Sequence, residues 1–261
     1  GKHTPDFPPQ VHIHTLDLTD QAAVLTLFRE LQPTHIYHLA SFAAVGKSFA
    51  EAAPLLHNNT LLQLNVLEAV RQVTPQARIL TIGSAEEYGL VPAAQANTPI
   101  DEHTPLNPIN PYAVSKVTQD LLAQAFFLSF DLHVVRARPF NHIGERQTAD
   151  FVVPAFASQV VKVERGEQDS IKVGNLTTVR DFTDVKDMVT AYICLMEKGK
   201  AGEVYNIGTG TGWQIQQILD MLLKYSKTSV RVEEDAARMR PRDIPSFLAN
   251  SAKIRALGWA P

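Results

Sequence analysis

The chain has 261 residues, 45% of them hydrophobic, so it can bury at least one full core. Lys and Arg number 24 against 27 Asp and Glu, a formal net charge of -3, which provides no basic excess for nucleic acid or an anionic membrane. The most apolar stretch, 121–130, is too short to span a bilayer, and the single Cys194 excludes an internal disulfide. We therefore expect a soluble, cytoplasmic protein with no nucleic-acid partner, no membrane partner and no metal.

Strand-like and helix-like patterns alternate along the first half of the chain. In order, we expect a strand at 11–16, a helix at 21–31, a strand at 35–40, a helix at 49–73, a strand at 78–83, a helix beginning at Pro111 and a strand at 132–138. These strands are nearly all apolar, so helices should cover both faces of the sheet. The pattern predicts an α/β fold with a doubly wound parallel sheet.

After Pro139 the alternation is looser, which indicates a second, smaller α/β lobe. There we expect helices at 151–165, 185–197 and 215–225, strands at 171–174, 203–208 and 229–232, and a last short helix.

Three side chains form the strongest chemical signal. Ser84 follows the third expected strand, and Tyr112 and Lys116 share one face of the next helix because they lie four residues apart. A phenol with its ordinary pKa of about 10 is a poor acid–base group near neutral pH, and a nearby ammonium lowers that pKa. Since ligands bind at the carboxyl ends of parallel strands, this set predicts acid–base catalysis at a carbonyl or hydroxyl oxygen.

Several segments together resemble the extended short-chain dehydrogenase/reductases that act on nucleotide sugars. They are SAEEYG (84–89), PYAVSK (111–116), RPFNHIG (138–144), VGNLTTVRDFTDVKDMV (173–189), EVYNIGTG (203–210) and RPRDIP (240–245). The resemblance implies a Rossmann-like, NAD(P)-dependent oxidoreductase of nucleotide sugars. Within the family, it is greatest to enzymes that transfer hydride from NADPH to C4 of a GDP-4-keto-6-deoxyhexose and form a GDP-6-deoxyhexose such as GDP-D-rhamnose. The expectation of NADP(H) rather than NAD(H) rests on this resemblance alone.

The resemblance also assigns roles to single positions. Tyr112 would donate the proton, Lys116 would lower its pKa and bind the nicotinamide ribose, and Ser84 would hold the sugar oxygen. The other catalytic candidate is Glu86. The expected cofactor contacts are Asp17, Leu18, Leu39, Ala40, Ser41, Asn59, Tyr112, Lys116 and Pro139. The expected substrate contacts are Ser84, Asn141, Asn175, Arg180, Arg240 and Asp243.

Among these substrate contacts, the two arginines suit a diphosphate because a guanidinium presents a planar fork to its oxygens. By the same resemblance, residues 1–138 and 180–207 would form the dinucleotide-binding domain, and residues 139–179 and 208–261 the nucleotide-sugar lobe.

Two alternatives remain open. Dehydratases of this family place Thr, then Asp or Ser, then Glu where this chain has Ser84, Ala85 and Glu86. One polar group is therefore missing while the glutamate remains, and we favour a reductase over a GDP-mannose 4,6-dehydratase or another epimerase or dehydratase. The alternative of another class is a non-catalytic sensor of a nucleotide sugar or of the cofactor.

Glycine-rich sequence is expected before Asp17, where the family places its cofactor-binding turn, but none is found there. We expect this first strand–turn–helix unit to be absent from the sequence. Gly208, Gly210 and Gly212 follow a strand and mimic a dinucleotide fingerprint, but Trp213 occupies the place of the third glycine, so we reject them as the cofactor turn.

Apolar side chains surround the second half of the helix that begins at Pro111, which is more than one buried stripe requires. We therefore expect a homodimer in which this helix and residues 49–73 pack against the same helices of a second copy.

Overall fold

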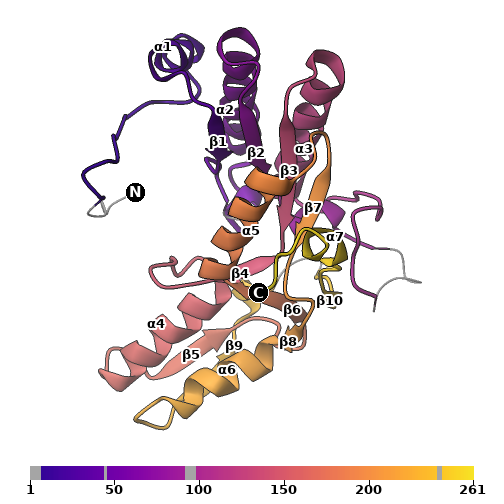
Figure 1. Cartoon of the computed structure of the whole chain (residues 1–261). Coiled ribbons are helices and arrows are strands. Elements are labelled where there is room, and N and C mark those ends of the chain that lie inside the picture. Colours follow the sequence, from indigo (N-terminus) through magenta and orange to yellow (C-terminus); the bar gives the residue numbers. More distant parts are fainter. Residues whose placement is uncertain (1–6, 44–45, 92–97, 240–242) are drawn as a thin grey trace.

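The computed structural model describes residues 7–43, 46–91, 98–239 and 243–261, apart from the side chain of Lys47. Within these residues the first sheet has four parallel strands in the order β1-β2-β3-β7 (Figure 1). The strands are β1 (His35–His38), β2 (Arg78–Ile82), β3 (Val134–Pro139) and β7 (Val204–Ile207). The strand order requires crossover connections, as the sequence predicts for a parallel sheet.

Three helices pack on one face of the first sheet. They are α1 (Gln21–Leu31), α2 (Ala52–Val73) and α3 (Pro111–Phe130). Phe28, Val66 and Phe126 meet Ile79 and Val134 in one buried apolar cluster beneath them. Helix α3 begins where the sequence predicts, because the side chain of Asn110 accepts the amide of Ala113 at 2.8 Å and Pro111 has no N–H to satisfy.

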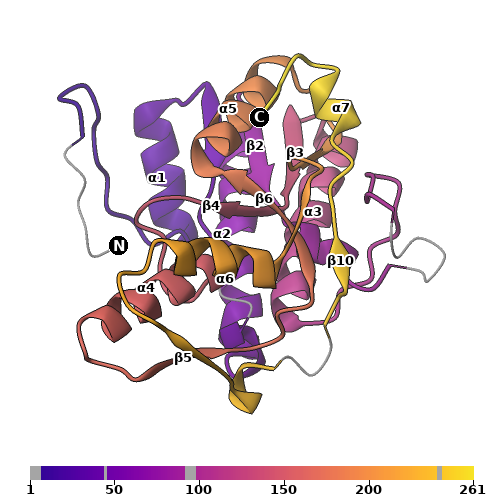
Figure 2. The same cartoon turned by 90° about the horizontal axis from the view of Figure 1, so that it is seen from below.

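Helices α5 (Val185–Lys198) and α7 (Ala252–Arg255) pack on the opposite face (Figure 2). Leu195, Ile254 and Trp259 bury their side chains there against Val135 and Tyr205. With helices on both faces, the doubly wound α/β fold predicted from the sequence is confirmed.

The second lobe is built on two small sheets, which lie below the first sheet in Figure 1. One has the order β10-β6-β4, with β8 antiparallel to β6, and the other pairs β5 with β9. The strands are β4 (Asn141–Ile143), β5 (Ser170–Val173), β6 (Val179–Asp184), β8 (Gly212–Gln214), β9 (Arg231–Glu234) and β10 (Ser246–Phe247). Helices α4 (Val152–Glu164) and α6 (Ile215–Lys224) close its apolar core, which includes Phe156, Ile171 and Leu219.

The strand predicted at 11–16 is wrong. These residues have no regular secondary structure, and no described strand pairs with them. Their alternating apolar residues, Val11 and Ile13, are exposed. A strand depends on hydrogen bonds to a neighbour, so its pattern alone does not form one.

The predicted division into two lobes stays a prediction, and two segments pack with the other lobe than the one to which the prediction assigns them. Strand β6 pairs with the second lobe rather than with the first sheet, whereas α7 packs on the first sheet. Among the described residues, no helix is long and apolar enough to cross a membrane.

Candidate active site

A cavity of about 390 Å³ opens at the carboxyl ends of β1, β2 and β3, where the first sheet meets the second lobe. The first sheet and its helices contribute Leu39, Ser41, Ser84, Glu86, Tyr112, Lys116, Pro139 and Tyr192 to its wall. The second lobe contributes Asn141, His142, Gln147, Asp150, Phe151 and Phe182. The cavity therefore lies where ligands bind in open α/β sheets.

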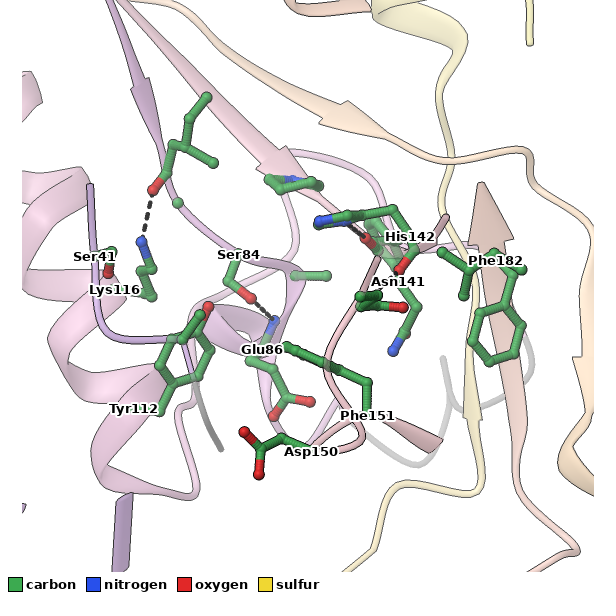
Figure 3. A pocket seen from close by; sticks show the side chains of 18 of the residues that line it. Ser41, Ser84, Glu86, Tyr112, Lys116, Asn141, His142, Asp150, Phe151 and Phe182 are labelled. Atoms are coloured by element: carbon green, nitrogen blue, oxygen red, sulfur yellow. Dashed lines mark hydrogen bonds between the residues drawn. The ribbon is translucent and has the colours of Figure 1, made fainter. Parts of the chain in front are cut away.

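The structure brings Ser84, Tyr112 and Lys116 together in this cavity (Figure 3). Ser84 follows β2 and caps the short 3-10 helix η2 (Ala85–Tyr88), where its Oγ accepts the amide of Glu86 at 3.2 Å. Tyr112 and Lys116 occupy the first turns of α3, with Lys116 Nζ 6.0 Å from the centre of the Tyr112 ring. The spacing in the sequence thus does place the three groups at one site.

Lys116 is buried, and its Nζ donates to the carbonyl oxygen of Ile82 at 2.8 Å. Burial lowers the pKa of Lys116 to about 8, and the charge of Glu87 partly opposes this shift. An ammonium has three N–H donors, and the described residues offer it this one acceptor. Lys116 therefore keeps donors for a ligand.

The pKa of the Tyr112 phenol is raised above its ordinary value, and the lowering of this pKa by Lys116 stays a prediction. Burial is the main cause, the charges of Glu86 and Glu87 add to it, and a hydrogen bond with Ser84 opposes it. The ammonium of Lys116 is engaged with the β2 backbone and does not offset the burial. The phenol of Tyr112 is consequently protonated near neutral pH and can act as a proton donor.

Glu86, the other catalytic candidate, also faces the cavity, and its Oε2 accepts from Asn110 Nδ2 at 3.1 Å. In Figure 3 Glu86 and Asp150 both point into the same space. Next to Glu86, Ala85 is buried and provides only a methyl group.

The sequence model of the GDP-mannose 4,6 dehydratase family matches residues 2–261. The chain belongs to this family. It is 33% identical to a GDP-6-deoxy-D-mannose reductase from Pseudomonas aeruginosa over 100% of the chain and 88% of that protein. The predicted membership is thereby confirmed, and with it, at the level of the family, an NAD(P)-dependent enzyme of nucleotide sugars.

Two solved structures show how far the likeness to the family extends. The structure of RMD from Pseudomonas aeruginosa complexed with NADPH has a TM-score of 0.87, with 33% identity over 95% of this chain and 82% of that chain. The UDP-glucose 4-epimerase of Thermus thermophilus, in complex with NAD, has a TM-score of 0.85 and 28% identity over 98% of this chain and 81% of that chain. Both cofactors therefore occur among the relatives.

Among the cofactor contacts that family membership suggests, Leu39, Ser41 and Pro139 line the cavity, whereas Ala40 and Asn59 do not. Asn59 lies behind the loop after β1, where its Oδ1 accepts the amide of Phe42 at 2.8 Å and its Nδ2 donates to Ser115 Oγ at 2.9 Å. Asn59 thus ties this loop to α3.

Asp17 and Leu18 lie outside the cavity, just before α1. The Asp17 carboxylate accepts from the amide and the hydroxyl of Thr19, at 2.9 and 2.8 Å, and these bonds lower its pKa. Asn65 Nδ2 of α2 donates to the carbonyl oxygen of Leu18 at 2.9 Å. The structure therefore gives both residues a structural role at the start of α1.

Of the expected substrate contacts beyond Ser84 that the structure describes, only Asn141 lines the cavity. Asn175, Arg180 and Asp243 form a separate cluster, in which Arg180 Nη2 lies 2.8 Å from Asp243 Oδ1 and Asn175 Nδ2 lies 3.4 Å from Asp243 Oδ2. Strand pairing places Arg180 beside Phe247, which does line the cavity. Arg240 lies outside the described residues.

Sequence reasoning missed several residues of the cavity wall, among them His142, Gln147, Asp150, Phe151 and Tyr192. His142 lies inside the RPFNHIG segment, so the resemblance could have included it. Tyr192 lies on α5, and no local pattern indicates which face of that helix reaches the cavity. Burial raises the pKa of its phenol, and the nearby Tyr112 adds to the shift.

The rejected glycine-rich segment has another function in the structure. The amides of Thr209 and Gly210 donate to the buried carboxylate of Asp181, at 2.9 and 2.8 Å. Gly212 and Trp213 lie in the short strand β8, which separates this segment from helix α6. These amides are already engaged, which agrees with the rejection of this segment as a cofactor turn.

Proposed function

We propose that this chain is a reductase that transfers hydride from NADPH to C4 of GDP-4-keto-6-deoxy-D-mannose and forms GDP-6-deoxy-D-mannose, also called GDP-D-rhamnose. The observation that carries the proposal is the 33% identity, over the whole chain, to a GDP-6-deoxy-D-mannose reductase. The geometry of the cavity supports it, because Ser84 and Tyr112 can both reach one ligand oxygen.

In this proposal Tyr112 holds the proton that the new C4 alkoxide takes up, and its raised pKa keeps that proton in place until charge develops. The Ser84 hydroxyl hydrogen-bonds the same sugar oxygen and orients it. A bound nicotinamide cofactor supplies the hydride.

The residues of the cavity fit the nicotinamide end of such a cofactor. The buried Lys116 keeps donors that the described residues leave unused, and ribose hydroxyls are suitable acceptors. Leu39, Ser41 and Pro139 continue the same wall. We assign Ala40 and Asn59 to the support of this wall, and Asp17 and Leu18 to the distant end of the cofactor.

We infer NADPH rather than NADH, because the Pseudomonas aeruginosa structure that resembles this chain is complexed with NADPH. Titration of the full-length protein with each dinucleotide, followed by fluorescence, tests this inference. We expect tighter binding of NADPH, and equal or tighter binding of NADH would contradict it. The proposed compartment is the cytoplasm, which suits a chain with one free cysteine, Cys194.

For the substrate, we assign the sugar end to Asn141 and Ser84 in the cavity. We assign the diphosphate end to the cluster of Asn175, Arg180 and Asp243, together with Arg240. The Arg180 guanidinium is paired with Asp243, so a diphosphate would have to share or replace that partner.

The second candidate function is GDP-mannose 4,6-dehydratase, and it rests on Glu86, a carboxylate inside the cavity. Elimination must also remove the C5 proton and expel the C6 hydroxyl, which requires further acid–base groups. Ala85 provides none where dehydratases have Asp or Ser. We therefore favour the reductase.

The test uses the full-length protein with GDP-4-keto-6-deoxy-D-mannose and NADPH, followed by cofactor absorbance and by chromatography of the product. We expect oxidation of NADPH and formation of GDP-6-deoxy-D-mannose. Conversion of GDP-mannose to the keto sugar with NADP+ would favour the dehydratase instead. Tight binding of the GDP-sugar without any turnover would favour a sensor.

We further propose a homodimer. Val114, Leu121 and Leu128 lie seven residues apart along α3, so they share one side of the helix, and all three are exposed. Phe126, by contrast, is buried in the apolar cluster beneath α3. We expect light scattering at micromolar concentration to give twice the mass of one chain, whereas a monomer would contradict the proposal.

A further inference from the structure

A group of charged side chains is buried directly beneath Ser84. It consists of Glu87, Asp120, Arg136 and Arg138, and we call it the Glu87 cluster. The Glu87 side chain is 0% exposed and those of Asp120 and Arg138 are 2% and 5% exposed. Arg138 Nε lies 3.0 Å from Glu87 Oε2 and donates to Asp120 Oδ2, and Arg136 Nη1 lies 3.1 Å from Asp120 Oδ1.

Glu87 connects this cluster to the active site through the backbone. Its Oε1 accepts the amide of Ser84 at 2.7 Å, and the Ser84 Oγ accepts the amide of Glu86 in return, which makes a capping box. A Cβ on Gly83 would overlap Glu87 Oε1, so glycine at that position allows the carboxylate to approach. The Ser84 amide is thereby held by a side chain that lies entirely in the interior.

The cluster also joins the three elements that carry the site. Glu87 belongs to η2, which Ser84 caps. Asp120 lies on α3 one turn after Lys116, and Arg138 precedes Pro139 at the end of β3. The position of Ser84 relative to Tyr112 therefore depends on contacts that Glu87 makes with α3 and β3.

Stability alone does not explain such a cluster. Desolvation of buried charges offsets most of their mutual attraction, and apolar replacements of similar volume are often no less stable. The backbone amide that Glu87 holds belongs to Ser84, whose hydroxyl contacts the sugar in the proposed function. We therefore propose that Glu87 is a positioning residue, which fixes Ser84 so that its hydroxyl and Tyr112 meet the same sugar oxygen. This inference rests on the proposed function.

The surroundings of Glu87 indicate which replacement preserves its contacts. Burial and the adjacent Asp120 raise the pKa of Glu87, and the charge of Arg138 opposes this rise. Lys116 and Tyr112 of α3 also face the Glu87 carboxyl group. The N–H of Arg138 Nε is directed to Asp120 Oδ2, so within the described residues Glu87 Oε2 is close to the guanidinium without a hydrogen bond from it. A protonated Oε2 can donate to Asp120, and so can the amide of glutamine, while the glutamine oxygen still accepts from Ser84.

The experiment compares Glu87→Gln with Glu87→Leu in the full chain. We expect E87Q to keep kcat within about threefold, and E87L to lose about 10²-fold in kcat with KM nearly unchanged, because a misplaced group costs on that order. If E87L does not fold, Glu87→Asp provides the same test, since its shorter side chain keeps the carboxyl group and does not reach the Ser84 amide.

Tyr88→Phe is the matched control. The Tyr88 hydroxyl accepts from Arg138 Nη1 at 3.0 Å and donates to Asn206 Oδ1 at 2.7 Å, so its loss disturbs the same cluster without touching Ser84. We expect Y88F to lower the melting temperature and to leave kcat unchanged. An equal loss of kcat in Y88F and E87L would overturn the positioning role.

A second readout does not depend on turnover. Hydrogen exchange of the Ser84 amide should be slow in the wild type, E87Q and Y88F, and faster by about tenfold or more in E87L or E87D, because these two lose its acceptor. Wild-type protection of Ser84 in E87L and E87D would show that Glu87 does not hold this backbone. If the wild type does not reduce the keto sugar, the proposed function fails, while the exchange data still decide whether Glu87 holds Ser84.

Discussion

The two faces of the first sheet are packed with different kinds of side chain. Toward α5 and α7, the strands present Leu80, Val135, Ala137, Tyr205 and Ile207, which form an apolar core with those helices. Toward α3, the same strands present the apolar Ile79 and Val134 near their starts, and the buried polar Thr81, Arg136 and Arg138 toward their carboxyl ends. Neighbouring residues of a strand point to opposite faces, so the same strands build both interiors.

This difference separates two tasks within one sheet. The apolar face contributes non-directional burial and tolerates small shifts of its helices. The polar face has an energetic cost unless every buried group finds its partner, so it favours one arrangement of η2, α3 and β3. We infer that the apolar face mainly stabilises the fold, and that the polar part of the other face, at the carboxyl ends of the strands, mainly orients the catalytic groups.

The strongest test of this division is Tyr112→Phe on the polar side. Loss of the proton donor should lower kcat by about 10²-fold or more, the usual contribution of a general acid. The free energy of unfolding should change by no more than about 1 kcal/mol, because one hydroxyl is lost. Steady-state kinetics and urea denaturation measure the two quantities. If Tyr112→Phe lowered the free energy of unfolding and left kcat unchanged, the polar side would stabilise the fold and not orient the catalytic groups.

On the apolar side, Leu195→Ala removes a fully buried side chain between α5 and the sheet. We expect it to lower the free energy of unfolding by about 2–5 kcal/mol, the range for such cavities. The kcat of the folded fraction should stay at the wild-type value. Denaturant titration and active-site counting check this, and a large fall in kcat would show that the apolar face also orients the site.

The pH dependence sharpens the comparison further. Because burial lowers the pKa of Lys116 to about 8, its ammonium is lost as the pH rises above that value. We expect kcat/KM to fall by about tenfold per pH unit on this alkaline side. In the same region the folded state binds fewer protons than the unfolded chain, so the contribution of Lys116 to stability increases with pH. Lys116→Arg should shift the alkaline fall of kcat/KM to higher pH. A wild-type kcat/KM that stays constant up to pH 10 would contradict the role of this charge.

The smallest expected effect belongs to Glu86→Gln. In a reductase Glu86 removes no proton, and glutamine keeps its size and much of its hydrogen bonding with Asn110. Reduction of the keto sugar should therefore fall less than about tenfold. If the variant instead abolishes conversion of GDP-mannose by a wild type that performs it, the chain is a dehydratase.

The same comparison explains what the sequence could predict. Strands β1, β2, β3 and β7 were predicted because apolar residues dominate them, and α3 because Asn110 and Pro111 mark its start. Strands β4 and β6 were missed because their residues, such as Asn141, His142 and Asp181, are polar and depend on partners distant in the chain. The prediction for 11–16 failed for the opposite reason, since this segment has the alternating pattern but pairs with none of the strands in the described part of the chain.

For the site, the motif predicted that Ser84, Tyr112 and Lys116 meet. It did not predict the pKa of Tyr112, because that depends on how deeply α3 buries the phenol. The pairing of Arg180 with Asp243 joins residues far apart in the sequence, and no local pattern indicates it.

Helix α3 has one further consequence. Tyr112 and Lys116 lie in its first turns, while Val114, Leu121 and Leu128 form an exposed stripe along the same helix. A second copy seated on that stripe would also fix the helix that carries the proton donor. Catalytic competence would then be a collective property of two chains, and the specific activity of a diluted solution would fall in step with the fraction of protein still paired.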